Sequence, residues 1–318
     1  MTVTFGPTVD ELAPRPPAPE NGRRRDAAFE YVRVGSYDEA VEALEHYGAR
    51  AKVLAGGQSL VPMMNLRLVR PGVLIDINGI DAGQPYFELD RLVLPAMTRY
   101  CEVLASPTVS AGSPLLAAAV SRVGNVRVRN RGTLGGSLAQ GEATAELGAV
   151  MLALGSEIIV YGPRGYRTIA AEDFFLGYLT TSLQPEEVIT GLCLPLARPR
   201  RGWSFHEMSR RSGSSAIVGV AANVELAPDG GEISSARLGL IGVADRPVVG
   251  SFEAVSSMVG EVPTLAQLDA VAFAVAAATC PVDDVQASGS YRRRMVRVLA
   301  RRALNEAVLR AGGRVGTA

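Results

Sequence analysis

Short apolar runs alternate with segments of helical periodicity in the first part of the chain. Residues 29–34, FEYVRV, have the character of a strand, and Ser36 with Glu39 has the spacing of a capping box, which predicts a helix through about Tyr47. A strand at 51–56, an apolar segment at 60–68 and a strand at 73–77 follow. Alternation at these lengths predicts a small α/β unit that ends near residue 85.

The following stretch, up to residue 201, predicts a second unit. Its pattern indicates a strand at 91–99, helices near 100–104 and 114–123, a longer apolar helix from Ala143 to Leu154, and strands at 157–169 and 186–196. Gly155 stands where a helix ends in a left-handed residue. The two units together form one expected domain, residues 28–201, with subdomains of about 28–85 and 86–201.

The segment ARPRRG, residues 197–202, marks a boundary, and the residues after it have a different pattern of apolar and polar positions. Alternating apolar runs at 202–211, 216–226 and 235–243 predict a three-stranded antiparallel sheet, with a tight turn at PDGG, residues 228–231. Helical patterns follow near 250–258, 264–277 and 291–310. The expected fold class is therefore α+β, with a C-terminal domain over 202–318.

Composition narrows the class of protein. The chain has 318 residues, 47% of them hydrophobic, which is enough for more than one core. Its 32 basic and 32 acidic residues cancel, which disfavours nucleic acid or an anionic membrane as partner. Residues 1–27 are rich in proline and polar residues without the apolar core of a secretion signal, and we expect a flexible arm on a cytoplasmic protein without a membrane span.

The cysteines and histidines are too few and too scattered for a metal site. Cys101, Cys193 and Cys280 lie far apart without C-x-x-C spacing, and His46 and His206 are the only histidines. A zinc site, an iron–sulfur cluster, a disulfide framework or a histidine-based catalytic triad within this chain is not expected. The cysteines are expected to be buried as small apolar residues.

Two glycine-rich segments are the main candidates for chemistry. The first, LAGGQSL at 54–60, follows a strand; the second, GTLGGS at 132–137, is interpreted as a loop before a helix that opens with Glu142 and Glu146. Glycines that take positive φ expose backbone N–H groups to an anion such as phosphate, and Gln58 and Ser59 can add donors. Each segment alone also suits a plain turn.

As a pair, the glycine segments suit the diphosphate of a dinucleotide, because the two segments could contact it from both sides. Neither segment has the G-x-G-x-x-G spacing of a Rossmann site or the Walker spacing of a P-loop, so a different way of holding a dinucleotide is indicated.

These segments also carry a resemblance. VLAGGQSLVPMMNLRLVRPGVLIDI and VRVRNRGTLGGSLAQGEATAEL resemble the flavin-binding segments of the FAD-binding medium subunit of molybdenum hydroxylases, the xanthine dehydrogenase and carbon monoxide dehydrogenase family. The likeness runs from about Phe29 to the C-terminus and includes DFFLGYLTT, RRSGSSAIVGVAA and YRRRMVRVLARRAL in the same order. It implies a two-subdomain FAD-binding domain of the p-cresol methylhydroxylase (PCMH) type, followed by a flavoprotein C-terminal domain.

The resemblance implies a set of FAD-contacting residues. The first segment is expected to wrap the diphosphate and the second to contact it from the other subdomain, with Thr98, Glu146, Ile189 and His206 beside the cofactor. The two segments comprise Val53, Leu54, Ala55, Gly56, Gly57, Gln58, Ser59 and Leu60, and Thr133, Leu134, Gly135, Gly136 and Ser137. For Glu146, a favourable position at a helix N-terminus is the alternative explanation.

The sequence departs from the family at two places. Many relatives have HADP where this chain has Gln140 to Ala143, and Asp-Phe where it has Ser214 and Ser215. The details of flavin tuning are thus not carried over.

Two groups of arginines remain. Those of the last helix, Arg292, Arg293, Arg294, Arg297, Arg301 and Arg302, suit a solvated face or a docking surface for a partner subunit. Arg127, Arg129 and Arg131 lie next to the second glycine segment, where one of them could neutralise a phosphate.

The expected function is that of an electron-transfer subunit with one non-covalent FAD and no catalytic acid, base or nucleophile of its own. The resemblance implies a large molybdenum–pterin subunit and a small subunit with two [2Fe-2S] clusters as partners, in a dimer of heterotrimers. Electrons would pass from the clusters through FAD to an external acceptor. A stand-alone FAD-dependent oxidoreductase of the same fold and a flavin-free scaffold subunit are the alternatives.

Overall fold

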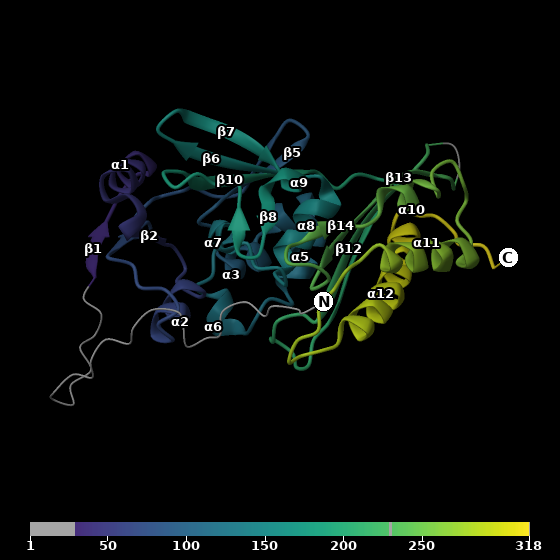
Figure 1. Ribbon diagram of the computed structural model, residues 1–318. Coiled ribbons are helices and arrows are strands. Elements are labelled where there is room, and N and C mark those ends of the chain that lie inside the picture. Colours follow the sequence, from purple (N-terminus) through teal and green to yellow (C-terminus); the bar gives the residue numbers. More distant parts are fainter. Residues whose placement is uncertain (1–28, 229–230, 318) are drawn as a thin grey trace, which may run out of the picture.

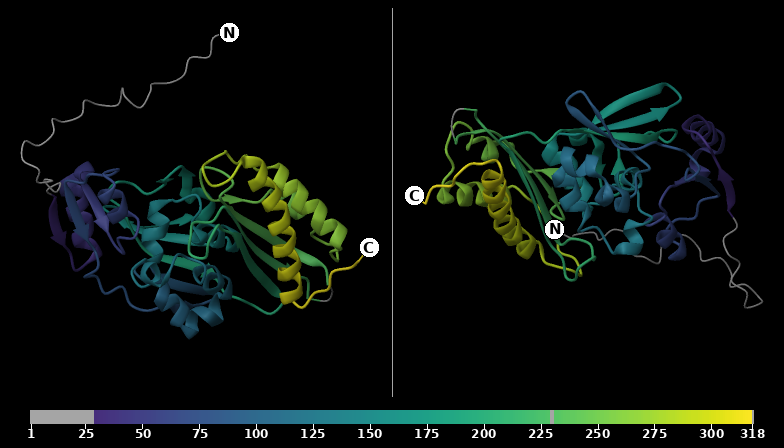
Figure 2. Two further views of the ribbon diagram at one scale, coloured as in Figure 1. Left: turned by 90° about the horizontal axis from the view of Figure 1, so that it is seen from below. Right: turned by 180° about the vertical axis from the view of Figure 1, so that it is seen from behind.

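The computed structural model describes residues 29–228 and 231–317, arranged as three parts in a row (Figure 1). The expected arm at 1–27 and part of the turn at 228–231 lie outside these residues. Strands from distant parts of the chain form separate sheets, and helices lie between and beside them, as the two further views in Figure 2 also show.

The first part is a parallel sheet with strand order β1-β3-β2. Its elements are β1 (Glu30–Arg33), α1 (Tyr37–Tyr47), the 3-10 helix η2 (Gly48–Arg50), β2 (Ala51–Leu54), α2 (Leu60–Asn65) and β3 (Val73–Asp76). Ser36 caps α1 by accepting from Glu39 N at 3.1 Å, while the Glu39 carboxylate accepts from Gly35 N at 2.7 Å. The predicted cap is present, with its return bond one residue earlier.

The central part is a five-stranded antiparallel sheet with the order β4-β5-β10-β6-β7. The strands are β4 (Tyr86–Glu88), β5 (Arg91–Pro95), β6 (Glu157–Gly162), β7 (Gly165–Ala170) and β10 (Val188–Pro195). A short hairpin adds β8 (Phe175–Gly177) and β9 (Thr180–Thr181). The register of β10 shifts between Ile189 and Gly191, which places an irregularity beside a predicted site residue.

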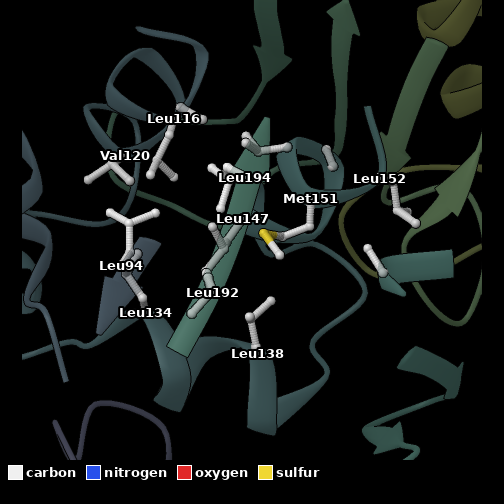
Figure 3. Packing of buried hydrophobic residues seen from close by; sticks show 14 of the residues in the cluster. Leu94, Leu116, Val120, Leu134, Leu138, Leu147, Met151, Leu152, Leu192 and Leu194 are labelled. Atoms are coloured by element: carbon white, nitrogen blue, oxygen red, sulfur yellow. The ribbon is translucent and has the colours of Figure 1, made fainter. Parts of the chain in front are cut away.

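Helices of the central part cover this sheet. They are α3 (Tyr100–Ala105), α4 (Pro107–Gly112), α5 (Pro114–Val120), α6 (Val126–Arg129), α7 (Leu134–Gln140), α8 (Glu146–Leu154) and α9 (Ala171–Phe174). Figure 3 shows leucines of β5 and β10 packed against side chains of α5, α7 and α8, among them Leu94, Leu192 and Met151. Gly155 ends α8 with φ 60°, as predicted.

The C-terminal part is a four-stranded antiparallel sheet with the order β11-β12-β13-β14. Its elements are β11 (Arg201–Met208), β12 (Val218–Leu226), β13 (Ile233–Ile241), β14 (Val248–Val249), α10 (Phe252–Ser256), α11 (Leu265–Ala277) and α12 (Gly289–Arg310). The three predicted strands are present, and the two-residue β14 adds a fourth.

Both faces of this C-terminal sheet are covered. Helix α12 packs on β11 and β12, while α8 packs on β12 and β13 from the other side. Because both faces are covered, β12 is buried at almost every position, which explains its nearly continuous apolar run. Side chains on one face, such as Phe205 and Ile241, join the core of the central part, and those on the other face, such as Val220, form a second core under α12.

Candidate functional site

The first glycine segment leaves β2 at the carboxyl edge of the parallel sheet. Within the described residues, the backbone N–H groups of Gly56, Gly57, Gln58 and Ser59 donate to no backbone or side-chain acceptor. Ser59 precedes α2 without capping it through its side chain. Gly57 has φ +72°, a conformation that favours glycine. This segment therefore presents a row of free donors, as an anion site requires.

The second glycine segment differs from its predicted form. Thr133 caps α7, and its hydroxyl accepts from Gly136 N at 3.1 Å, so Gly135 and Gly136 belong to the first helical turn rather than to a loop. The N–H groups of Leu134 and Gly135 donate to backbone carbonyls of Thr98 and Ala96. The backbone N–H groups of this segment therefore bond within the protein. Its glycines instead allow other parts of the chain to approach closely.

The two segments touch. A Cβ on Gly56 would lie 2.2 Å from the carbonyl oxygen of Arg131, and one on Gly135 would lie 2.7 Å from the Ala96 side chain. Since real Cβ atoms do not approach so closely, these glycines are needed for the contact itself. Asn78 supports the first segment from the end of β3, because its side-chain amide donates to Ala55 O at 2.8 Å and to the Asp76 carboxylate at 2.6 Å.

A cavity of about 310 Å³ opens between the two segments and the loop that follows β11. Its walls include predicted residues from both segments, namely Gly56, Gly57, Gln58, Ser59, Thr133, Gly136 and Ser137, together with Glu146. Ser214 and Ser215 also line it, so the position where relatives differ lies at the site.

A second cavity, of about 430 Å³, adjoins the first along the same segments. Most of the residues that line it have apolar side chains, and its walls include the predicted residues Val53, Leu60, Gly135 and Ile189. Gly136 and Gln140 line both cavities. The volumes fall within the range of about 300–1,000 Å³ that is usual for cofactor sites, and together the cavities suit a long ligand with one polar and one apolar end.

The other predicted FAD-contacting residues of the central and first parts lie behind the walls of the two cavities. Leu134 and Thr98 are buried, at 0% and 5% exposure, and the Thr98 hydroxyl has no partner. Leu54 and Ala55 join β2 to the first segment, and both carbonyls face the Asn78 amide.

His206 is not brought to the site by the structure. Its Nε2 lies 2.6 Å from the Glu306 carboxylate of α12, on the face of β11 that is turned away from both cavities. Successive side chains of a strand point to opposite faces. The neighbouring Glu207 therefore faces the central part, and the expectation for His206 is replaced by a contact within the C-terminal part.

Glu142 and Glu146 are also separated, contrary to the predicted helix start. Gly141, with φ +63°, ends α7 and turns the chain, so Glu142 lies in the connection and only Glu146 begins α8. Glu146 is 8% exposed, and burial raises its pKa to about 7. A polar side chain without a cation partner at this depth is typical of a functional cavity.

Sequence reasoning missed several residues of the polar cavity. Tyr100 at the start of α3 is buried against Gly132, where a Cβ would lie 2.9 Å from its ring, and burial raises its pKa. Gly213 lines the cavity from the C-terminal part, with φ +78° and a backbone contact to Gly124. The signal available was the glycine itself, since positive φ and close approach both require it.

Three earlier expectations about charge and sulfur are corrected or refined. Cys280 is exposed and Cys101 and Cys193 are half-buried, so burial as small apolar residues is wrong for Cys280. Arg292 is 5% exposed and donates to Asp284 and to the Ile217 and Gly242 carbonyls, so it is not part of a solvated face. Arg129 donates to the Val123 and Gly124 carbonyls and holds the cavity wall.

The described residues contain neither a group of metal ligands nor a membrane-spanning helix. Across 29–228 and 231–317, no three histidine, cysteine or acidic side chains are grouped as metal ligands would be. Among the helices of these same ranges, none has the length and apolarity to cross a bilayer.

The fold and the site define a class of protein. A parallel α/β subdomain and a second, antiparallel subdomain meet through two glycine segments, with free backbone donors and two adjoining cavities at the meeting point. Such a protein binds a dinucleotide-sized cofactor outside the Rossmann and P-loop arrangements.

Comparisons identify the family. Residues 27–197 match the profile of the FAD binding domain in molybdopterin dehydrogenase, and residues 203–307 match that of the CO dehydrogenase flavoprotein C-terminal domain. The chain belongs to this family of FAD-binding subunits, which confirms the resemblance, the fold class and FAD as the cofactor.

Individual relatives agree over nearly the whole chain. The carbon monoxide dehydrogenase medium chain of Hydrogenophaga pseudoflava is 36% identical over 280 residues, covering 88% of this chain and 96% of the relative. A solved structure of carbon monoxide dehydrogenase from that organism matches with a TM-score of 0.86, 36% identity, and coverage of 89% of this chain and 98% of that chain. The 6-hydroxypseudooxynicotine dehydrogenase complex subunit alpha of Paenarthrobacter nicotinovorans is 34% identical over 285 residues, covering 89% and 96%.

Proposed function

We propose that this chain is the FAD-carrying electron-transfer subunit of a molybdenum hydroxylase complex. It would take electrons from iron–sulfur clusters of a small partner subunit and deliver them through FAD to an external acceptor. The observation that carries the proposal is the row of free N–H donors at Gly56 to Ser59, placed beside two adjoining cavities in a chain of this family.

The residues present fit FAD. The donors of the first glycine segment would hold the diphosphate, and Thr133, Gly136 and Ser137 would approach it from the other subdomain. The polar cavity would take one end of the cofactor and the apolar cavity, lined by Val53, Leu60 and Ile189, the other. The unpartnered hydroxyl of Thr98 is a further polar group behind this site.

The redox chemistry belongs to the flavin when it is bound, because a flavin accepts two electrons and releases them singly or in pairs. The chain's own residues bind and orient it and exclude water. The glycine segments fix its position, and the loop carrying Gly213 and Ser214 closes the polar cavity from the C-terminal part. We assign no nucleophile or catalytic acid for substrate hydroxylation to this subunit.

The partners are proposed from the relatives. Carbon monoxide dehydrogenase and 6-hydroxypseudooxynicotine dehydrogenase are complexes in which the similar chains are named as a medium chain and a subunit alpha. By analogy, hydroxylation would occur on a large molybdenum–pterin subunit and two [2Fe-2S] clusters would be carried by a small one, with a dimer of heterotrimers as the assembly.

The test is purification of the native protein from its source, followed by a visible spectrum and subunit analysis of the same sample. Oxidised-flavin bands with two co-purifying subunits, iron and molybdenum support the proposal. Acid denaturation should release the FAD, since the binding is non-covalent. Flavin and turnover without partners would indicate a stand-alone oxidoreductase, and a stable complex without flavin would indicate a scaffold subunit.

A further inference from the structure

Glu146 is a buried acid that the proposed function leaves without a role. It opens α8, lines the polar cavity and is 8% exposed. No described side chain donates to it or pairs with it; the hydrogen bond that acts on it comes from its own backbone N–H. A carboxyl group placed in this way has lost its hydration without gaining a cation.

A second carboxyl group approaches from the C-terminal part. Glu207 lies on the same face of β11 as Phe205, whose side chain belongs to the central core. Its Oε2 is buried and has no hydrogen-bond partner. Glu207 lines a cavity of about 340 Å³ together with Arg122 and Ser212. Gly213 lies on the wall of this cavity and of the polar cavity, so the two cavities adjoin.

Both acids have raised pKa values. Burial raises the pKa of Glu207 to about 7, and the charge of Glu146 contributes to that rise, while the exposed guanidinium of Arg122 opposes it. Burial also raises the pKa of Glu146 to about 7, so each acid can hold and release a proton near neutral pH.

Other ionisable groups lie around the two acids on several elements. Tyr100 of α3 faces Glu146, and its hydroxyl stays protonated because burial raises its pKa. Glu142 lines the same cavity from the α7–α8 connection. Arg237 of β13 donates to Leu152 O at 3.4 Å, at the far end of α8. Among the described residues, Arg122 is the cation that acts on the pair.

We propose that Glu146 and Glu207 form a proton relay between solvent and the flavin, with Glu146 on the cofactor side and Glu207 on the side of Arg122. This rests on the proposed function. Iron–sulfur clusters deliver electrons without protons, whereas a flavin that gains two electrons takes up at least one proton. With the flavin ring in the polar cavity, the O–H bond of Glu146 would break and its proton would pass to the reduced flavin. Glu207 would then reprotonate Glu146 and would itself be reprotonated from water through the Arg122 cavity.

The experiment uses the native complex with FAD bound and three variants: Glu146→Gln, Glu207→Gln and, as a control, the exposed Glu253→Gln of α10. Time-resolved infrared spectra are recorded while the oxidised flavin is reduced. The wild type and the control should show a transient loss of a protonated carboxyl signal, which returns as Glu207 and then water supply a proton. Glu146→Gln should lack this transient loss, and in Glu207→Gln the signal should return more slowly.

Kinetics provide the second readout. In the wild type the rate of flavin reduction by the electron donor should fall about tenfold between pH 6 and pH 8, as the two acids lose their protons. In both Gln variants this dependence should be lost, and Glu146→Asp should restore part of it. If Glu146→Gln loses FAD or fails to fold, Glu207→Gln decides alone.

An unchanged transient loss of the carboxyl signal in Glu207→Gln and Glu146→Gln, or none in the wild type, would overturn the relay while FAD binding and electron transfer stand. Absence of FAD from the native complex would instead contradict the proposed function. The two failures are therefore distinguishable.

Discussion

At the scale of single residues, the candidate site depends on a glycine that has no Cβ and on a hydroxyl that has no hydrogen-bond partner. Gly56 can lie against the backbone of Arg131 only because it has no Cβ. The Thr98 hydroxyl is buried and unpartnered, and such a group costs free energy unless a ligand satisfies it.

We expect Gly56→Ala to lower FAD affinity by about tenfold or more, because its methyl group would lie 2.2 Å from the Arg131 carbonyl oxygen and push the segments apart. Flavin fluorescence titration of the apoprotein measures this. Gly35→Ala is the matched control, since its Cβ would have only the Glu39 carboxylate near it, at 3.8 Å. Equal affinities for the two variants would show that the contact between the segments does not matter.

Thr98→Val tests the unpartnered hydroxyl. The substitution keeps the shape and removes the unsatisfied group, so the apoprotein should gain about 1 kcal/mol of stability while FAD binding weakens. Thermal unfolding with and without FAD measures both effects. Unchanged FAD binding by the variant would show that the hydroxyl does not reach the cofactor.

At the scale of elements, strand ends and strand faces place the functional side chains. Asn78 follows β3 and fixes the segment that follows β2, because adjacent parallel strands end at the same edge of the sheet. The alternation of β11 sends His206 toward α12 and Glu207 toward the central part.

Asn78→Ala should weaken FAD binding and destabilise the protein by about 1–3 kcal/mol, since it leaves the Ala55 carbonyl and Asp76 without their shared donor. Asn78→Asp should be worse, because a carboxylate cannot donate and would repel Asp76. Chemical unfolding and FAD titration give the two values. An Asp variant that binds as well as wild type would contradict this support.

His206→Ala should leave the FAD dissociation constant within about twofold, because the imidazole contacts Glu306 of α12 and not the cavities. Stability should fall slightly through loss of that pair. Isothermal titration with FAD is the measurement, and a large loss of affinity would restore the expectation drawn from the resemblance.

At the scale of the whole molecule, the C-terminal part completes the walls of the polar cavity. Its sheet is buried on both faces, its loop closes the polar cavity, and Glu207 lines a cavity that adjoins the one lined by Glu146. The packing of the C-terminal part against the central part and the protonation of these two acids therefore depend on each other.

The pH dependence of stability follows from the raised pKa values of Glu146 and Glu207, about 7 each against an ordinary 4.5. Between these pH values the folded protein keeps protons that the unfolded chain releases, so stability falls as pH rises, and above about 7 no further change comes from these groups. For the deeply buried Glu146 the slope is at most about 1.4 kcal/mol per pH unit.

The unfolding temperature of the apoprotein, measured from pH 4.5 to pH 8, tests this. Glu146→Gln should flatten the fall and exceed the wild type in stability at pH 8. The exposed Glu253→Gln should follow the wild type throughout. If the wild-type protein instead gained stability toward pH 7, the idea that burying the two ionised acids costs folding free energy would be wrong.

Local sequence determined the main elements and the positions of the two glycine segments. Ser36 and Gly155 are caps where the spacing predicts them, and alternation defined the main strands, because capping and strand periodicity depend on neighbours along the chain. Short elements such as α6 and β14 have too few residues to show a period.

The sequence by itself thus determined the α+β class, the two glycine segments and, through resemblance, the family and FAD. Only the tertiary structure decided that the donors of the second segment are used within the protein, that His206 contacts α12, and that Glu207 lines a cavity next to the one lined by Glu146. The physical reason is that donor satisfaction, strand facing and burial depend on residues distant in the chain, such as Ala96, Glu306 and Gly213.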